Sequence, residues 1–255
     1  MHKFKISFFS INLLTQVNVN ILIPYPNLNM EKGRVLWALH PAMKGADFYF
    51  DELGLGKIVD SKNIAIVCPE CGNNFFIDSD YSQMASFIQE ELKSYIEKML
   101  SSILCNNLEM YGLGISMGAY GLYDWFLNDP NFFKTVYLVS GVYSLDSKKD
   151  ERIKRNRSQK NLIRLLENKK SLLFNKLDTV KKCDLFCKTY EMNIVTETHI
   201  KLYCGNSDYI SLRPTEDLNR VLLQKSIQSE MIVSEGEHNL EYWTYACEHI
   251  INNLP

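Results

Sequence analysis

The stretch that most constrains the fold is the pentapeptide GISMG at residues 114–118. It lies where a strand-like apolar run, residues 108–113, ends and a helix-like run, residues 119–127, begins. Glycine at both ends permits a sharp turn that lifts the Ser116 hydroxyl clear of a sheet. A G-x-S-x-G pattern arises by chance in roughly one chain in twenty of this length. Its placement, together with partners found downstream, therefore makes Ser116 a candidate nucleophile.

Length and charge set the first limits on function. A chain of 255 residues can bury one sizeable core, so we expect one domain over residues 1–255, with a cap or insertion segment at about 144–198. The net charge of −2 gives no field that would attract nucleic acid or an anionic membrane surface. The expected partner is therefore a small molecule, and the sequence leaves the oligomeric state open.

Cysteine usage and hydropathy indicate the compartment. Seven cysteines, an odd number scattered through predicted strands and helices, fit reduced thiols better than a disulfide framework. Asn12 interrupts the apolar stretch 6–14, no small-residue cleavage site follows it, and no apolar run reaches 18 residues. We therefore expect no signal peptide, no membrane span and a cytoplasmic location.

Strand-like and helix-like runs alternate along the chain. The β-branched and aromatic runs at 4–9 and 17–23 indicate an antiparallel pair, and the spacing of apolar residues over 84–99 indicates an amphipathic helix. The alternation predicts an α/β fold: a mainly parallel central sheet with an antiparallel N-terminal strand pair and helices on both faces. The other predicted strands are 34–39, 64–68, 108–113, 135–139, 200–203 and 231–233, and the other predicted helices are 47–55, 119–127, around 162–166, 214–223 and 240–251.

A serine nucleophile needs a base that takes its proton and an acid that orients the base. His238 follows a predicted strand and precedes the last predicted helix, and Asp208 also comes directly after a strand. The order Ser116, Asp208, His238 is that of α/β-hydrolases and differs from the two common serine protease orders. A single His or Asp in a loop is usually a solvated turn residue. Three such residues at strand ends in this order predict a catalytic triad.

The tetrahedral intermediate of acyl transfer also needs hydrogen-bond donors aimed at its oxyanion. The backbone N–H of Met117, at the start of a predicted helix, is the first candidate. The second should come from the loop that follows residue 39. Because Pro41 has no N–H to give, Ala42 is the expected donor.

Three motifs carry a resemblance to a known family: LGISMGAYG at 113–121, YCGNSD at 203–208 and GEHNLEYW at 236–243. They resemble the tributyrin esterase and acetyl esterase group of serine α/β-hydrolases, which is related to S-formylglutathione hydrolases and family 1 carbohydrate esterases. The resemblance implies the α/β-hydrolase fold, a serine triad and hydrolysis of short-chain carboxylic esters through an acyl-enzyme, with no cofactor. The chain departs from the family at Pro41, where the family usually has glycine, and at Leu240, where it usually has an aromatic residue.

Other chemistry has weaker support in the sequence. Cys68-Pro-Glu-Cys71 has the spacing of a redox pair or half a zinc site, but no second C-x-x-C or nearby histidine completes a set of metal ligands, and we expect no metal. The basic cluster 148–160 contains acidic residues and no aromatic ones, which favours a solvated face over a nucleic-acid patch. Five aromatic residues are candidates for an acyl pocket, although such residues more often pack in the core: Phe75, Phe76, Tyr120, Trp125 and Trp243.

Several functions stay open at this stage. The leading one is a carboxylic ester hydrolase, in which His238 shuttles the proton of Ser116. An acyltransferase or an S-acyl hydrolase would use the same three residues, and a peptidase would use His238 to protonate a leaving amine. A non-catalytic binding protein that kept the fold is the alternative of a different class, and Pro41 motivates it.

Overall fold

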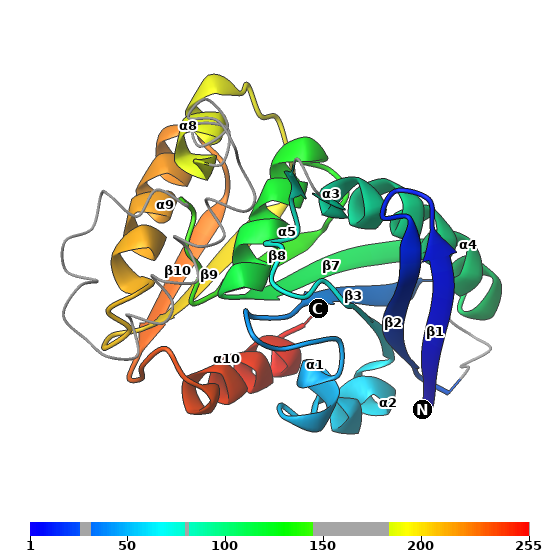
Figure 1. Cartoon of the computed structure of the whole chain (residues 1–255). Helices are drawn as coiled ribbons and strands as arrows, with labels where there is room; N and C mark the ends of the chain where they lie inside the picture. The colour runs from blue at the N-terminus through cyan, green and yellow to red at the C-terminus, as the bar shows by residue number, and fades with distance from the viewer. Residues whose placement is uncertain (26–31, 80–81, 145–183, 255) are drawn as a thin grey trace.

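An eight-stranded sheet forms the centre of the molecule (Figure 1). The structure, a computed structural model, describes residues 1–25, 32–79, 82–144 and 184–254. The strands of the sheet lie in the order β1-β2-β4-β3-β7-β8-β9-β10, and β5 and β6 form a separate two-stranded sheet. The bounds are β1 His2–Ser10, β2 Thr15–Ile23, β3 Gly33–Leu39, β4 Ile64–Pro69, β5 Asp78–Ser79, β6 Ser82–Gln83, β7 Leu108–Ile115, β8 Thr135–Val139, β9 His199–Gly205 and β10 Ser229–Ser234.

The N-terminal strand pair forms as the sequence predicts. β1 runs antiparallel to β2 along its whole length, and β2 in turn runs antiparallel to β4. From β4 onward every neighbouring pair in this sheet is parallel. Alternation explains the place of β2, because Val17, Val19 and Ile21 point to the same face of the sheet and are buried there. The predicted α/β architecture is confirmed.

Helices cover both faces of the sheet, and each face has its own apolar core (Figure 1). The helix α5 is buried along residues 117–127 and occupies the middle of the larger core. One face is covered by α3 (Met84–Ser86), the π-helical segment η2 (Phe87–Leu92), α4 (Lys93–Ile103), α5 (Met117–Asn128), α8 (Leu185–Glu191) and α9 (Leu212–Gln224); the other by α1 (Phe48–Asp51), the 3-10 turn η1 (Leu55–Ile58), α2 (Val59–Lys62) and α10 (Leu240–Asn252).

Two predicted helices differ from the structure in their extent. The helix expected over 47–55 is confined to α1, because Gly54 takes a left-handed conformation (φ 65°) from which the separate turn η1 begins. The helix expected over 84–99 extends to Ile103 and contains η2, in which the backbone is wound as a π-helix. Apolar spacing at three and four residues does not distinguish these windings.

One predicted helix and one predicted segment are largely beyond what the structure describes. The helix expected around 162–166 lies outside the described residues, as does most of the cap or insertion expected at about 144–198. The part that is described includes α8, which the sequence pattern did not predict. Asp184 directly precedes this helix and caps it, since its carboxylate accepts hydrogen bonds from two N–H groups of the first turn.

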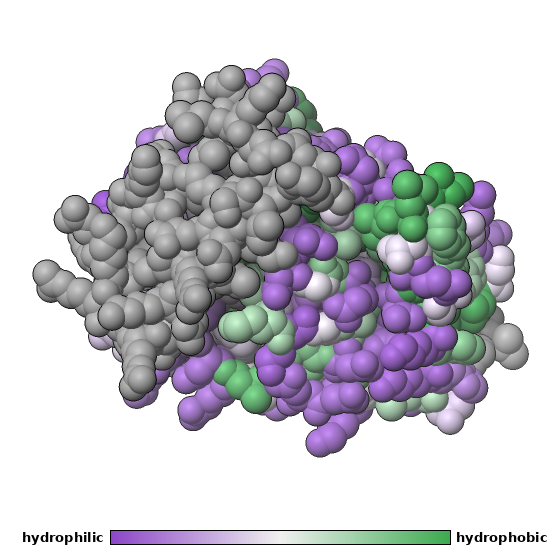
Figure 2. All heavy atoms as spheres, viewed as in Figure 1, coloured by the Kyte–Doolittle hydropathy of each residue, from purple (hydrophilic) through white to green (hydrophobic). Residues whose placement is uncertain are grey.

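The β1–β2 hairpin ends in a firmly held apolar tip. The Glu91 carboxylate on η2 accepts hydrogen bonds from the Ser10 hydroxyl and from the backbone N–H groups of Ile11 and Asn12, at 2.7, 2.9 and 3.2 Å. Burial acts to raise the pKa of Glu91, but these hydrogen bonds outweigh it and the pKa is lowered. Ile11 and Leu14 are each 76% exposed, and apolar surface gathers over this end of the hairpin in Figure 2.

The parallel strands bring the predicted site residues to one edge of the sheet. Ser116 directly follows β7, Asp208 lies in the loop after β9, and His238 lies in the loop after β10. β3 ends at Leu39, immediately before the loop that contains Pro41. The carboxyl edge of such a sheet is where ligands of open α/β folds bind.

Candidate active site

Ser116 occupies a strained turn between β7 and α5. Its backbone has φ 53° and ψ −111°, a positive φ that residues with side chains rarely adopt. The Ser116 N–H donates to the Val139 carbonyl of β8 at 2.9 Å, which fixes the turn against the neighbouring strand. Strain of this kind costs on the order of 1–3 kcal/mol and persists where the surroundings impose it.

Close packing explains both glycines of the pentapeptide. A Cβ at Gly114 would collide with the Gly118 carbonyl, and a Cβ at Gly118 would collide with the Leu39 carbonyl at the end of β3. The first turn of α5 therefore sits directly against two strand ends. A larger residue at either position would push the helix, and with it Ser116, away from the sheet.

The three residues predicted as a triad meet in space. Ser116 Oγ lies 3.1 Å from His238 Nε2, and His238 Nδ1 lies 2.9 Å from Asp208 Oδ2. Asp208 is fully buried, Ser116 is nearly so, and the His238 side chain keeps 15% of its surface exposed. The result is a continuous hydrogen-bonded chain from a serine hydroxyl through an imidazole to a buried carboxylate.

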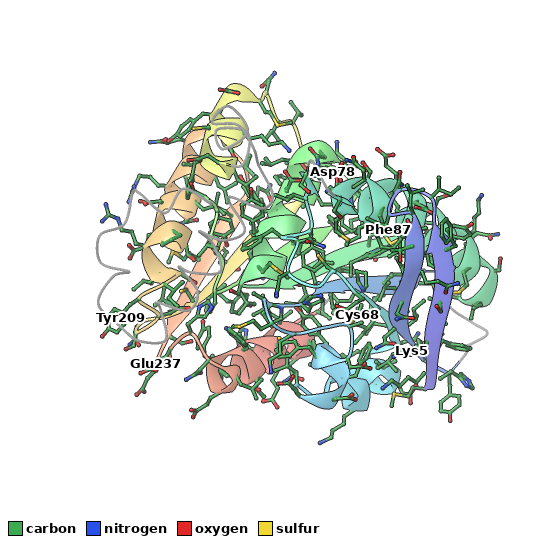
Figure 3. All side chains as sticks on the ribbon, viewed as in Figure 1. Lys5, Cys68, Asp78, Phe87, Tyr209 and Glu237 are labelled. Atoms are coloured by element: carbon green, nitrogen blue, oxygen red, sulfur yellow. The ribbon has the colours of Figure 1, made fainter. Side chains whose placement is uncertain are left out.

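Backbone contacts join the loops that carry the acid and the histidine. Asn206 N–H donates to the Ser234 carbonyl at 2.8 Å, and Ser207 N–H donates to the Gly236 carbonyl at 2.9 Å. Gly205 approaches Gly236 so closely that a Cβ there would collide with the Gly236 carbonyl. Figure 3 labels one residue of each loop, the neighbours of Asp208 and His238 in the chain, and shows them at the same corner of the molecule.

The Asp208 carboxylate is held in its charged form. Burial acts to raise its pKa, but hydrogen bonding and charge attraction from His238, together with the Ser211 N–H, outweigh burial and lower the pKa. Oδ1 accepts the N–H groups of Ile210 and Ser211 at 3.1 and 2.9 Å, which leaves Oδ2 for His238. A carboxylate kept charged in this way can orient the imidazole and stabilise the imidazolium.

Trp243, one of the five aromatic residues considered for an acyl pocket, contacts His238. The two rings meet edge to face, with centroids 5.2 Å apart and an interplanar angle of 84°. The other four are core residues of 0–1% exposure: Phe75, Phe76, Tyr120 and Trp125. Leu240, where the resembling family usually has an aromatic residue, begins α10 and is 42% exposed.

The predicted oxyanion donors have N–H groups that are not otherwise used. Neither Met117 N nor Ala42 N donates to an acceptor among the described residues. In the same loop, Met43 N–H donates to Asn73 Oδ1 at 2.7 Å, and Lys44 N–H donates to the Pro41 carbonyl at 3.3 Å. Of residues 41–44, only Ala42 thus has an uncommitted N–H, which fits the role predicted for it.

The loop after β4, residues 70–74, contacts the loop after β3, and no sequence pattern predicted these contacts. Glu70 accepts the Ala46 N–H at 2.9 Å, and Asn73 accepts the Met43 N–H. Cys71 N–H donates to His40 Nε2 at 3.2 Å. Cys68 and Cys71 are both buried, and the C-x-x-C spacing here accompanies a backbone contact to the loop after β3.

His40 is a buried, neutral imidazole. Because a carbonyl only accepts, Nδ1 donates to the Pro41 carbonyl at 2.9 Å, and Nε2 accepts the Cys71 N–H. Burial lowers the pKa of His40, while the Pro41 carbonyl and the charge of Glu70 oppose that effect only in part. The ring is therefore a fixed link between two loops, and a proton on Nε2 would break it.

This burial predicts a pH dependence of stability. A histidine in an unfolded chain titrates near pH 6.5, whereas folded His40 binds a proton only at lower pH. The contribution of His40 is therefore complete above about pH 6.5 and is lost as pH falls through its lowered pKa, by up to about 1.4 kcal/mol per pH unit. We expect the free energy of unfolding in urea to fall more between pH 7.5 and 5.5 in the wild type than in His40→Gln. Equal pH dependence in both proteins would contradict this account.

Comparison with solved structures identifies the fold. No protein-family model matches the sequence, and neither does any curated protein. The structure is similar to an S-formylglutathione hydrolase from Agrobacterium tumefaciens (TM-score 0.75, 16% identity, covering 99% of this chain and 95% of that one). It is also similar to the S-formylglutathione hydrolase FrmB from Staphylococcus aureus (0.74, 16%, 98% and 97%) and to a CE1 ferulic acid esterase from Anaeromyces mucronatus (0.64, 14%, 99% and 90%). The chain has the α/β-hydrolase fold.

The predicted likeness to S-formylglutathione hydrolases and family 1 carbohydrate esterases is confirmed at the level of the fold. Within this fold, Ser116 stands at the turn between β7 and α5, and Asp208 and His238 follow β9 and β10. The order of the three in the chain and their positions after strands are those that the α/β-hydrolase fold uses for a serine triad.

Proposed function

We propose that this α/β-hydrolase is a serine carboxylic ester hydrolase that acts on short-chain acyl esters. The observation that carries the proposal is the hydrogen-bonded chain at the strained turn: Ser116 Oγ to His238 Nε2 at 3.1 Å, and His238 Nδ1 to Asp208 Oδ2 at 2.9 Å. The substrate would be a small-molecule ester, with no cofactor. Among the described residues no helix combines the length and apolar composition of a bilayer span. A cytoplasmic location stays a prediction from cysteine usage.

The proposed mechanism has two acyl-transfer steps. His238 Nε2 takes the Ser116 proton as Oγ attacks the ester carbonyl, and the N–H groups of Met117 and Ala42 stabilise the oxyanion. The intermediate then collapses, and His238 returns the proton to the departing alkoxide, which leaves as the alcohol. Water attacks the acyl-enzyme with the same base, which releases the carboxylic acid and restores the Ser116 hydroxyl.

An acyltransferase or an S-acyl hydrolase is the alternative that uses the same residues. The likeness to two S-formylglutathione hydrolases makes a thioester the first substrate to compare with an oxygen ester of the same acyl group. Added alcohols or thiols that raise product formation above hydrolysis would indicate transfer. A peptidase is less favoured, since this chain covers only 41% of the acylaminoacyl peptidase from Pyrococcus horikoshii that it resembles.

A fluorophosphonate probe tests the proposal directly. The reagent phosphonylates a serine that is activated by a neighbouring base, so we expect one adduct, on Ser116, in the folded wild-type protein. Heat-denatured protein is the control, because the Ser116–His238 hydrogen bond is lost on unfolding. Absence of labelling at Ser116 in folded protein would leave the non-catalytic binding protein as the better interpretation.

We predict a preference for acetyl to butyryl groups over long acyl chains. Four of the five aromatic side chains that were candidates for an acyl pocket are packed in the core, so they do not extend an apolar groove from Ser116. The family resemblance points the same way. The measurement is kcat/KM for a series of nitrophenyl esters from two to twelve carbons, with the highest value expected at two to four carbons. A maximum at ten carbons or more would contradict the prediction.

A further inference from the structure

Ser211 occupies the N-cap position of α9, but its hydroxyl forms hydrogen bonds outside the helix. It directly precedes α9, it is fully buried, and its side chain caps none of the helix N–H groups. The N–H groups of Ile210 and Ser211, which precede α9, donate to the Asp208 carboxylate. Ser211 Oγ lies 2.7 Å from the Ser140 carbonyl oxygen and 3.1 Å from His238 Nδ1.

The direction of these hydrogen bonds follows from what each atom can do. A carbonyl oxygen only accepts, so the single hydroxyl proton of Ser211 goes to Ser140. Toward His238, Ser211 Oγ is then left as an acceptor. His238 Nδ1 faces two acceptors, Ser211 Oγ and Asp208 Oδ2, and so it carries the proton itself. The other ring nitrogen, Nε2, is left with its lone pair toward Ser116.

The Ser140 carbonyl is fixed by its surroundings. Ser140 follows β8, is fully buried and has a positive φ of 49°. Its N–H donates to the Tyr203 carbonyl of β9 at 2.8 Å. A positive φ is unfavourable for serine and persists only where the surrounding structure imposes it. The acceptor that takes the Ser211 proton is therefore held by two neighbouring strands.

We propose that Ser211 is a positioning residue which, through the Ser140 carbonyl, holds His238 in the tautomer protonated at Nδ1. The inference rests on the proposed serine hydrolase function, because only that function needs Nε2 unprotonated. If the Ser211 hydroxyl donated to Nδ1 instead, the imidazole proton would sit on Nε2 and face Ser116, and the base would be lost. Donation to Ser140 prevents this arrangement and keeps Ser211 Oγ as a second acceptor for the Nδ1 proton beside Asp208 Oδ2. Ser211→Ala would remove that acceptor.

Kinetics of matched variants give the first test. Ser211→Ala removes the hydroxyl and keeps the backbone N–H that binds Asp208, and we expect kcat to fall about tenfold with KM within about twofold. Ser211→Thr retains a hydroxyl and should stay within about threefold of the wild type. The control is Thr215→Val, which removes a buried hydroxyl one turn further along α9 and should leave kcat unchanged.

Nitrogen NMR of protein labelled with 15N-histidine gives the decisive readout. At pH 8.5, wild-type His238 should show a protonated Nδ1 and an unprotonated Nε2, with the signals assigned by their loss in His238→Gln. In Ser211→Ala both signals should move toward the average of the two tautomers. Unchanged signals in that variant, or changed signals with an unchanged kcat, would overturn the proposal. This readout needs no substrate, so it stands apart from fluorophosphonate labelling of the wild type, which tests the proposed function itself.

Discussion

Ser116→Ala should reduce the hydrolysis of short acyl esters to the background rate, a loss on the order of a millionfold in kcat. The variant removes the atom that would form the acyl-enzyme, and no other hydroxyl occupies the strained turn. The fold should persist, because alanine meets the same backbone requirement as serine at φ 53° and one partly exposed hydrogen bond is worth only about 1 kcal/mol. Circular dichroism and the urea midpoint check the fold, and nitrophenyl acetate checks the rate.

The matched control is Ser207→Ala, in the loop that carries Asp208. The Ser207 hydroxyl donates a hydrogen bond to the Asn206 side chain at 3.1 Å and none to Ser116, Asp208 or His238. This variant should therefore keep wild-type activity and be labelled by the fluorophosphonate as strongly as the wild type. Turnover by folded Ser116→Ala at a rate comparable to that of the wild type would contradict the proposed mechanism.

Asp208→Asn should lower kcat by about a thousandfold or more. The structure gives a specific reason. Two backbone N–H groups, of Ile210 and Ser211, point at Oδ1, so the amide oxygen of asparagine would stay there and the amide NH2 would face His238. A donor at that place favours an unprotonated Nδ1, which puts the imidazole proton on Nε2 opposite Ser116. The pH-rate profile and kcat on acetyl esters measure the effect.

Two other carboxylates serve as controls for this prediction. Asp124 on α5 pairs with Lys188 at 2.8 Å, and Glu237 is the neighbour of His238 in the chain. Asp124→Asn and Glu237→Gln should both retain activity within a fewfold of the wild type. If Asp208→Asn were near wild type while either of these was inactive, the acid would be assigned to the wrong residue.

The sequence predicted the parts of the site that follow directly from strand ends. Ser116 was recognisable because it lies between Gly114 and Gly118. The close packing of β7, α5 and β3 leaves no room for a Cβ at either glycine. Asp208 and His238 were recognisable because each follows a strand of a parallel sheet, and parallel strands end together. Residue type and order in the chain were sufficient to predict that these three side chains lie together.

The supporting residues could not be predicted in the same way. Ser211 reads in the sequence as an ordinary residue before a helix, and its use of the Ser140 carbonyl depends on how two loops meet. The Glu70 and Asn73 side chains accept hydrogen bonds from backbone N–H groups of the loop after β3. Because almost every residue has a backbone N–H, such a contact cannot be recognised from residue types in the sequence. The windings of η2 and η1 were missed for a related reason, because apolar spacing reports which side of a helix is buried and not how it is wound.

The separation of Ser116 and His238 along the chain gives the proposed triad one more property. The hydrogen bond from Ser116 to His238 joins positions 122 residues apart, and His238 follows β10, the last strand along the chain and the outermost at its end of the sheet. Closing so long a loop carries an entropic cost that only nearly complete folding repays. Covalent labelling of Ser116 should thus lag behind the recovery of secondary structure during refolding from urea. The extent of Ser116 labelling would then measure the fraction of molecules in which β10 has joined the sheet.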